Sequence, residues 1–504
     1  MKAFLTILAG TFSIVVLHAQ PSEKPAAKNQ HTAQQNVQTD FLYFDNGDTL
    51  HGEFVGFDKK SNMLWKSPEA LDPICFSTGK ITRIVRNRGL GHKQAGLKST
   101  VLLTNGDVLP GSVLAADKTK LVFESIHMGE LTIPMDVISE IQLNPYGGDI
   151  FYQGPFSPED WKIIHPLKPE AQGEDKEGEQ EEHAPEPDDP LEQREWNHIA
   201  NSWYSGSEQS CLALENAVPD RCRLRFKLAW RGSRLYTGIA IHADLDAAPR
   251  GKNPHLRTNF AATLGNAYVL VLSSNYVALQ SCSFDEEGNP VNERIGQSVS
   301  LDLNARQEAV FEIRADRHTK QLLLYIDGAY RTNWDLGDQY TGKGNAFVIS
   351  KIHNNTDLRL SDMVISKWNG IKDSAQSMTS RKRDVILLCN GLDRFSGTFE
   401  GLKNGIISFS GSYENRINVP QKEVEQLKFA TEKARKNFTG KSGRRACFLI
   451  PPHGRITGIP QCSYNNQIKI SSELLGEFNL DMRYISMIEF SDQNRAFDIW
   501  NEHF

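Results

Sequence analysis

The chain has 504 residues, of which 39% are hydrophobic and 23% are charged. A chain of this length is expected to fold as several domains, and its composition is that of a soluble globular protein. The formal net charge of −6 argues against a dedicated nucleic-acid binder, which usually carries a basic excess.

The N-terminus has the pattern of a targeting segment. Lys2 supplies a positive charge, Ala3–Leu17 supply an apolar stretch, and Ala19 is a small residue at the expected cleavage point. The stretch is too short for a comfortable membrane span, although a buried N-terminal helix is an alternative. Residues 20–39 lack an apolar period and are expected to be a disordered lead-in. We therefore expect a signal peptide over 1–19 and an exported protein (periplasmic, cell-envelope or extracellular) without a membrane span in its mature chain.

A short phrase occurs four times and predicts a repeated β unit. It reads Asn-Gly-Asp or Asn-Gly, becomes His-Gly in the last copy, and follows a short apolar strand each time. Asn-Gly favours a two-residue type I′ turn with positive φ at both residues. A second glycine within the following strand is typical of a bend. The turn glycines are Gly47, Gly106, Gly391 and Gly454, and the bend glycines are Gly52, Gly111, Gly397 and Gly458.

Each copy contains about five short strands in about 45 residues, which suits a small bent barrel. This pattern resembles the Sm-like and SH3-like small barrels. The resemblance implies four barrels, over residues 40–88, 98–146, 383–430 and 444–492. The resemblance does not imply RNA binding, because we do not find in the sequence the loop residues that an Sm-type RNA pocket needs. Asp48 and Asp107 after the turn glycines favour turn chemistry over metal or ligand binding.

Residues 148–371 predict a separate, larger β domain. Residues 168–192 are a Pro/Glu/Asp run and are expected to form a disordered acidic loop. About ten to twelve alternating segments follow, which indicates a two-sheet sandwich in an all-β protein. Three segments resemble the concanavalin A-like lectin/glucanase and laminin-G sandwiches, including modules of secreted bacterial proteins of unknown function: Leu324–Gly328, Gly344–Ser350 and Leu360–Gly370.

No catalytic, metal or cofactor site is predicted. Retaining glycosidases of the resembled family carry alternating acids on one strand in an E-x-D-x-x-E manner, and no strand here has them. The acids from Asp285 to Glu287 precede Gly288 in a turn, and Asp244 and Asp246 are more typical of a plain loop than of a calcium site.

A binding face is predicted on the sandwich. Polar residues on its strands, opposite the expected core, are candidate ligand contacts: Arg225, Lys227, His242, Gln280, Arg314 and Lys351. The alternative is that this face is solvated or covered by the small barrels.

Seven cysteines are thinly spread along the chain. Cys211 could pair with Cys222 and Cys447 with Cys462 in an oxidising compartment, but buried free thiols are an equal alternative.

These patterns favour an exported, non-catalytic binding or scaffold protein that recognises carbohydrate or a cell-envelope component through the sandwich. One alternative is a glycan-processing enzyme, similar to glycoside hydrolases, with unrecognised acids. Another is a structural protein that assembles through its barrels. A glycan or an envelope protein is the expected partner, oligomerisation through the barrels is allowed, and no nucleic acid is expected.

Overall fold

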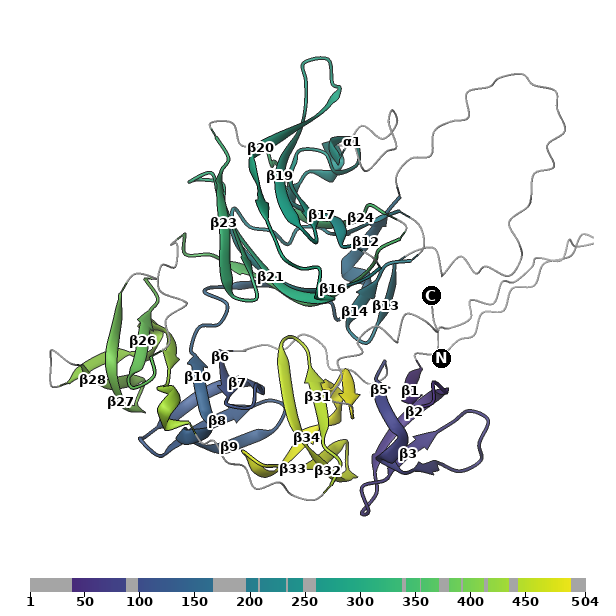
Figure 1. Ribbon diagram of the computed structural model, residues 1–504, viewed down its shortest axis with the longest axis vertical. Helices are drawn as coiled ribbons and strands as arrows, with labels where there is room; N and C mark the ends of the chain where they lie inside the picture. Colours follow the sequence, from purple (N-terminus) through teal and green to yellow (C-terminus); the bar gives the residue numbers. More distant parts are fainter. Residues whose placement is uncertain are drawn as a thin grey trace, which may run out of the picture. The chain divides into compact units, whose positions relative to one another are not determined.

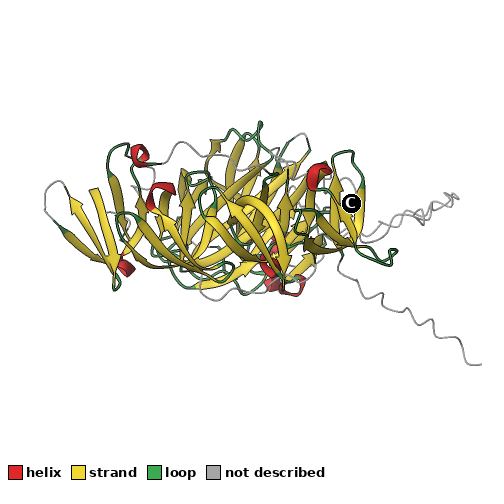
Figure 2. Ribbon diagram, turned by 90° about the horizontal axis from the view of Figure 1, so that it is seen from below, coloured by secondary structure: helices red, strands yellow, loops and turns green. Residues whose placement is uncertain are grey.

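A computed structural model describes residues 39–87, 98–165, 196–206, 209–232, 234–247, 260–337, 341–353, 355–370, 380–390, 393–411, 416–434 and 443–490. The signal peptide and the acidic loop predicted from the sequence lie outside these residues. The prediction of an all-β protein is confirmed, because strands dominate and the helices are short (Figure 2). None of the helices in the described ranges has both the length and the apolar character needed to cross a membrane.

Four five-stranded repeats, two before the central domain and two after it, share one order of elements (Figure 1). Repeat 1 contains β1 (Asp40–Phe44), β2 (Thr49–Phe57), β3 (Met63–Lys66), β4 (Ile74–Phe76) and β5 (Ile81–Val85). Repeat 2 contains β6 (Ser99–Leu103), β7 (Val108–Ala116), β8 (Lys120–Ser125), β9 (Gly129–Pro134) and β10 (Ile138–Gln142). Repeat 3 contains β26 (Asp384–Leu388), β27 (Arg394–Lys403), β28 (Ile406–Gly411), β29 (Ile417–Pro420) and β30 (Val424–Lys428). Repeat 4 contains β31 (Ala446–Ile450), β32 (Gly454–Tyr464), β33 (Gln467–Ser472), β34 (Gly476–Asp481) and β35 (Met487–Glu489).

The first turns of repeats 1, 2 and 4 differ from the predicted type I′ turn. In repeat 1 the Gly47 N–H donates to the Phe44 carbonyl (3.3 Å) and the Phe44 N–H donates to the Asp48 carbonyl (3.0 Å). Only the glycine has positive φ (+91°), and Asn46 does not. The two-residue prediction is therefore wrong: the loop has three residues, and the asparagine side chain stabilises it by accepting from the Asp48 N–H (3.1 Å).

Repeat 4 replaces this loop with Pro451, Pro452 and His453 between the paired residues Ile450 and Gly454. His453, and not Gly454, has the positive φ there (64°). In repeat 3, Gly391 lies outside the described residues.

The bend glycines lie where the second and third strands approach closely. A Cβ atom on Gly111 would lie 2.2 Å from the Glu124 carbonyl oxygen, and one on Gly397 would lie 2.0 Å from that of Ser410. Further along each second strand the register shifts, as between Val113 and Ala115. Close approach and a bulge together bend the strand so that one face encloses the core.

The repeats pair through their fifth strands in a nested order. β5 of repeat 1 pairs with β35 of repeat 4, with Ile84 opposite Ile488. β10 of repeat 2 pairs with β30 of repeat 3, with Ile141 opposite Leu427. Repeats 2 and 4 meet through β7 and β32, and residues of all four repeats belong to one apolar cluster.

The central domain is a two-sheet sandwich. The eight-stranded sheet has the order β13 (Asn197–Ile199), β14 (Ser202–Tyr204), β25 (Asp357–Lys367), β16 (Arg221–Arg231), β21 (Glu308–Asp316), β22 (Gln321–Ile326) and β23 (Ala329–Asp335), and β11 (Ile150–Gly154) also pairs with β25. The seven-stranded sheet has the order β12 (Trp161–Ile164), β15 (Cys211–Leu214), β24 (Ala346–Lys351), β17 (Tyr236–Ala243), β18 (Ala267–Ser273), β19 (Tyr276–Phe284) and β20 (Pro290–Ser300).

The two outer faces of the sandwich differ in chemistry. Leu224, Phe226 and Leu228 of β16 point into the core between the sheets, so the arginines and lysine between them lie on the outer face. The outer face of the seven-stranded sheet is apolar, and helix α1 (Phe260–Leu264) packs against it. A charged outer face therefore remains on the eight-stranded sheet.

All seven cysteines are free thiols, so the structure contains neither of the two bridges considered from the sequence. Cys211, Cys222 and Cys282 are buried, whereas Cys75 is exposed.

Candidate functional site

The structure divides the six predicted binding residues between the two sheets. Arg225 and Lys227 on β16 and Arg314 on β21 lie on the eight-stranded sheet. His242 on β17, Gln280 on β19 and Lys351 on β24 lie on the seven-stranded sheet. The first three are brought together, and the other three are separate from them.

Two residues of the second group hold neighbouring backbone in place. The His242 ring Nε2 lies 3.0 Å from the Pro219 carbonyl oxygen. The Lys351 ammonium group donates to the Gly206 carbonyl and lies 3.2 Å from the Asp357 carboxylate. Both side chains are buried, and Gln280 is half-buried. These contacts favour a structural role for His242 and Lys351.

On the eight-stranded sheet, carboxylates from β21 neutralise most of the cations in the β16 row. Three ion pairs join the strands: Arg221–Asp316 at 3.0 Å, Arg223–Glu312 at 3.0 Å and Lys227–Glu308 at 3.1 Å. Arg314 lies 2.7 Å from Glu312 as well. Burial raises the pKa of Glu312, but Arg223 and Arg314 outweigh burial and lower the pKa to about 2. This carboxylate is ionised and occupied by two guanidinium groups.

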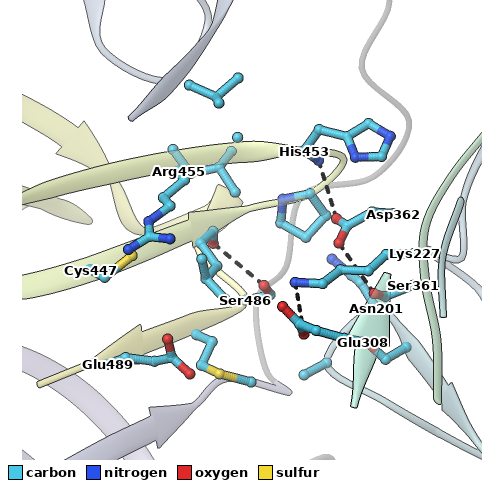
Figure 3. A pocket seen from close by; sticks show the side chains of 18 of the residues that line it. Asn201, Lys227, Glu308, Ser361, Asp362, Cys447, His453, Arg455, Ser486 and Glu489 are labelled. Atoms are coloured by element: carbon cyan, nitrogen blue, oxygen red, sulfur yellow. Dashed lines mark hydrogen bonds and ion pairs between the residues drawn. The ribbon is translucent and has the colours of Figure 1, made fainter. Parts of the chain in front are cut away.

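Beside this face lies a cavity of about 570 Å³, which we call the junction cavity. Its walls come from the outer face of the eight-stranded sheet and from repeat 4 (Figure 3). Five cationic side chains and three carboxylates line it: Arg225, Lys227, Arg359, Arg445, Arg455, Glu308, Asp362 and Glu489. Apolar residues such as Leu449 and Ile450 complete the lining, and the eight charged groups suit a hydrophilic ligand better than an apolar one.

Two residues with unusual backbone conformations meet in the junction cavity. The His453 N–H, in the first loop of repeat 4, donates to the Asp362 carboxylate over 3.2 Å. His453 has φ 64° and Asp362 has φ 52°, a region that costs most residues about 1–2 kcal/mol. Asp362 lies on β25 at an irregularity in its pairing with β16. Strained residues of this kind persist where the surroundings hold them, and they cluster at ligand sites.

The electrostatics keep His453 neutral and Asp362 ionised. Burial and the charge of Arg225 lower the pKa of His453 to about 3, although Asp362 opposes them. Burial raises the pKa of Asp362, but the charge of Lys227 and the hydrogen bond from the His453 backbone N–H oppose burial, and the pKa lies below its usual range. Among the residues that the structure describes, the buried Nε2 atom of His453 has no hydrogen-bond partner. A hydroxyl or amide group of a ligand would satisfy it.

Sequence reasoning missed Asp362, His453, Glu308 and Arg359. The available signal was the last turn phrase, which has a histidine before its glycine where the other copies have asparagine. The sequence pattern also assigned Asp107 to turn chemistry alone, whereas the structure gives it a contact with another repeat. It is buried and accepts from both the Thr457 N–H (2.9 Å) and the Thr457 hydroxyl (2.7 Å) of repeat 4, whereas Asp48 stays exposed.

No group of three or more metal-binding side chains occurs in the described part of the chain.

No protein-family model and no curated protein matches this chain. Solved structures that match part of this chain include the carbohydrate-binding module CBM66 from Bacillus subtilis, at 10% identity over 34% of this chain and 91% of that chain, with a TM-score of 0.25. A Bacillus subtilis protein of unknown function with a galectin-like fold is 10% identical over 44% of this chain and 96% of that chain, with a TM-score of 0.28. The Bacillus licheniformis β-glucanase is 7% identical over 44% of this chain and 98% of that chain, with a TM-score of 0.26. At these scores the likenesses assign no function to this chain.

Proposed function

We propose that this protein is an exported, non-catalytic binding protein that holds a hydroxyl-rich ligand, a glycan or another cell-envelope component, in the junction cavity. The proposal retains the predicted domains: a signal peptide over 1–19, a sandwich over 148–371, and four barrels of Sm-like or SH3-like type. The observation that carries it is the meeting of Asp362 and His453, both in strained conformations, on a polar cavity between the sandwich and repeat 4.

The cavity chemistry supports a hydrophilic ligand. Its carboxylates and guanidinium groups offer both acceptors and donors, as hydroxyl groups require. The lining also contains apolar residues, among them Leu449, Ile450 and Met487, so charged and apolar groups share the cavity wall. On the other sheet, α1 packs against part of the apolar outer face. The charged face, and not the apolar one, is therefore the proposed place of recognition.

The state of the carboxylates supports binding over glycan hydrolysis. A general acid needs a raised pKa, but the pKa of Asp362 is lowered. Glu308 is held by Lys227 at 3.1 Å, and Glu489 lies 3.5 Å from Arg83. Both carboxylates are therefore engaged in ion pairs, an arrangement that suits hydrogen-bond acceptance.

The pairing of the repeats bears on the scaffold alternative. The fifth strands β5, β10, β30 and β35 pair with one another within the chain. These edges are occupied in the monomer, so assembly through them would require the repeats to separate first. This favours the binding function over the scaffold function.

The test is a glycan array with the full mature chain, followed by calorimetry on any ligand found. We choose Asp362→Asn and His453→Asn, because asparagine tolerates positive φ better than most residues. Loss of a charge-assisted contact is expected to weaken binding by about 10- to 100-fold. Asp285→Asn, in an exposed turn outside the cavity lining, is the matched control and should bind like wild type. Binding that is equal in all three variants would refute this site.

A further inference from the structure

The outer face of β16 carries a row of four alternating cations, and three of them form ion pairs. Cationic residues alternate along the strand at positions 221, 223, 225 and 227. Arg221, Arg223 and Lys227 each lie within 3.1 Å of a carboxylate on β21. The side chain of Arg225, in the middle of the row, has no ion pair or hydrogen bond with the described residues, although its charge helps to lower the pKa of Glu312.

Register places Glu312 directly opposite Arg225, yet Glu312 is already occupied. Arg223 approaches it at 3.0 Å and Arg314 at 2.7 Å, so two guanidinium groups share this carboxylate. Arg225 therefore lacks the partner that the strand pairing would suggest.

The position of Arg225 allows its guanidinium group, which has no ion pair, to contact a ligand. The residue is half-buried and lines both the junction cavity and a second cavity of about 850 Å³. Repeats 2 and 3 supply much of the second lining, including Glu140 and Glu425. A ligand in the junction cavity can therefore reach a cation that is partly withdrawn from water.

The chemistry of arginine narrows the class of ligand. A guanidinium group stays protonated, so it cannot relieve partial burial by losing its charge. Its planar donors match the two oxygens of a carboxylate or the oxygens of a sulfate, and such charge-assisted pairs are stronger than neutral hydrogen bonds. The junction cavity has more cations than carboxylates, which also favours a ligand with a negatively charged group.

We propose that Arg225 binds an oxyanion group of the ligand and thereby selects acidic saccharides over neutral ones. This inference rests on the proposed function, because it concerns the ligand of the same cavity. A uronic-acid carboxylate and a sulfate ester share the required chemistry.

The experiment measures affinities of the full mature chain for three probes: neutral glucan oligosaccharides, oligogalacturonates and sulfated galactan oligosaccharides. Wild type should bind at least one acidic probe about 10- to 100-fold more tightly than the neutral probe. Arg225→Gln should remove that preference, because it should weaken binding of the acidic probe much more than binding of the neutral probe. Arg225→Lys keeps the charge without the planar donors and should give an intermediate loss.

The matched control is Arg231→Gln, which removes a cation from the same strand but lies outside both cavity linings. It should retain the wild-type preference. The acidic probe that binds identifies the carboxylate or the sulfate as the group recognised. Melting curves of all variants check that each one is folded.

The failures of the two proposals can be told apart. Binding of no saccharide probe would overturn the proposed function and this inference with it. Equal binding of neutral and acidic probes, or an acidic preference that survives Arg225→Gln, would overturn this inference while the proposed function stands.

Discussion

The close approach of two strands at Gly111 gives a quantitative prediction about repeat 2. Gly111→Ala adds a Cβ atom that would lie 2.2 Å from the Glu124 carbonyl oxygen and 2.6 Å from the ring of Phe123. Ordinary contacts of a Cβ atom begin at 3.4 Å, so β8 must move away from β7 by about 1 Å. The obstacle is backbone, which cannot rotate aside as a flexible side chain can.

The expected loss in the free energy of unfolding follows from two opposing effects. Overpacking costs about 1–3 kcal/mol, and a clash with backbone belongs near the upper end of this range. Replacing glycine lowers the entropy of the unfolded chain and returns about 0.4–1 kcal/mol. The net destabilisation of repeat 2 should be about 2 kcal/mol, which corresponds to about a 30-fold change in an equilibrium constant.

Hydrogen exchange of the full chain measures this locally, through peptides that cover 108–125. Gly111→Ala should speed exchange there by about 30-fold and leave the sandwich peptides unchanged. Gly106→Asn is the matched control: Gly106 has φ +86° and open space around its Cβ position, and asparagine tolerates that region. We expect the control to change exchange by less than about fivefold.

Two results would refute this reasoning. Unchanged exchange in folded Gly111→Ala would show that the strands can separate at little cost. Equal acceleration by both variants would show that loss of a glycine as such matters, and not the contact with Glu124.

Three further predictions concern buried polar groups. Burial lowers the pKa of His127 from 6.5 to about 4, so the unfolded chain binds a proton at this histidine more readily than the folded chain. The contribution of neutral His127 to stability should therefore be complete above about pH 6.5 and be lost as the pH falls to about 4. A Tm that depends equally on pH in His127→Gln would contradict this. Asp107→Ala should destabilise the contact with repeat 4 by about 1–3 kcal/mol and speed hydrogen exchange in 454–464, whereas Asp48→Ala, its exposed counterpart, should have no effect there. A maleimide should label exposed Cys75 rapidly and buried Cys282 only after unfolding, and fast labelling of native Cys282 would show that its strand opens readily.

Periodic patterns in the sequence predicted much of the fold. Alternation in β16 placed Leu224 and Phe226 in the core and Arg225 and Lys227 on the outer face, because side chains on a strand point to opposite faces in turn. The sequence does not indicate the pairing of β5 with β35, because the two strands lie about 400 residues apart and each has the pattern of an ordinary short strand.

The candidate site was predicted only in part for a similar reason. Arg225 and Lys227 belong to a periodic strand, but Asp362 and His453 act through positive φ values, which residue type alone does not reveal. Their meeting also depends on how repeat 4 packs against the sandwich. Local sequence patterns carry no information about such long-range contacts.

The nested strand pairing has a consequence for biogenesis. The outer edge of β5 stays without its partner until residues 487–489 have been synthesised, which means that nearly the whole chain must follow. During that interval a strand with buried Ile81, Ile84 and Val85 offers open backbone groups to any neighbouring chain. Contacts of such long sequence separation also form slowly. Nascent protein should therefore depend on a chaperone that shields this edge until repeat 4 arrives, and truncation before repeat 4 should lead to aggregation rather than to a smaller folded product.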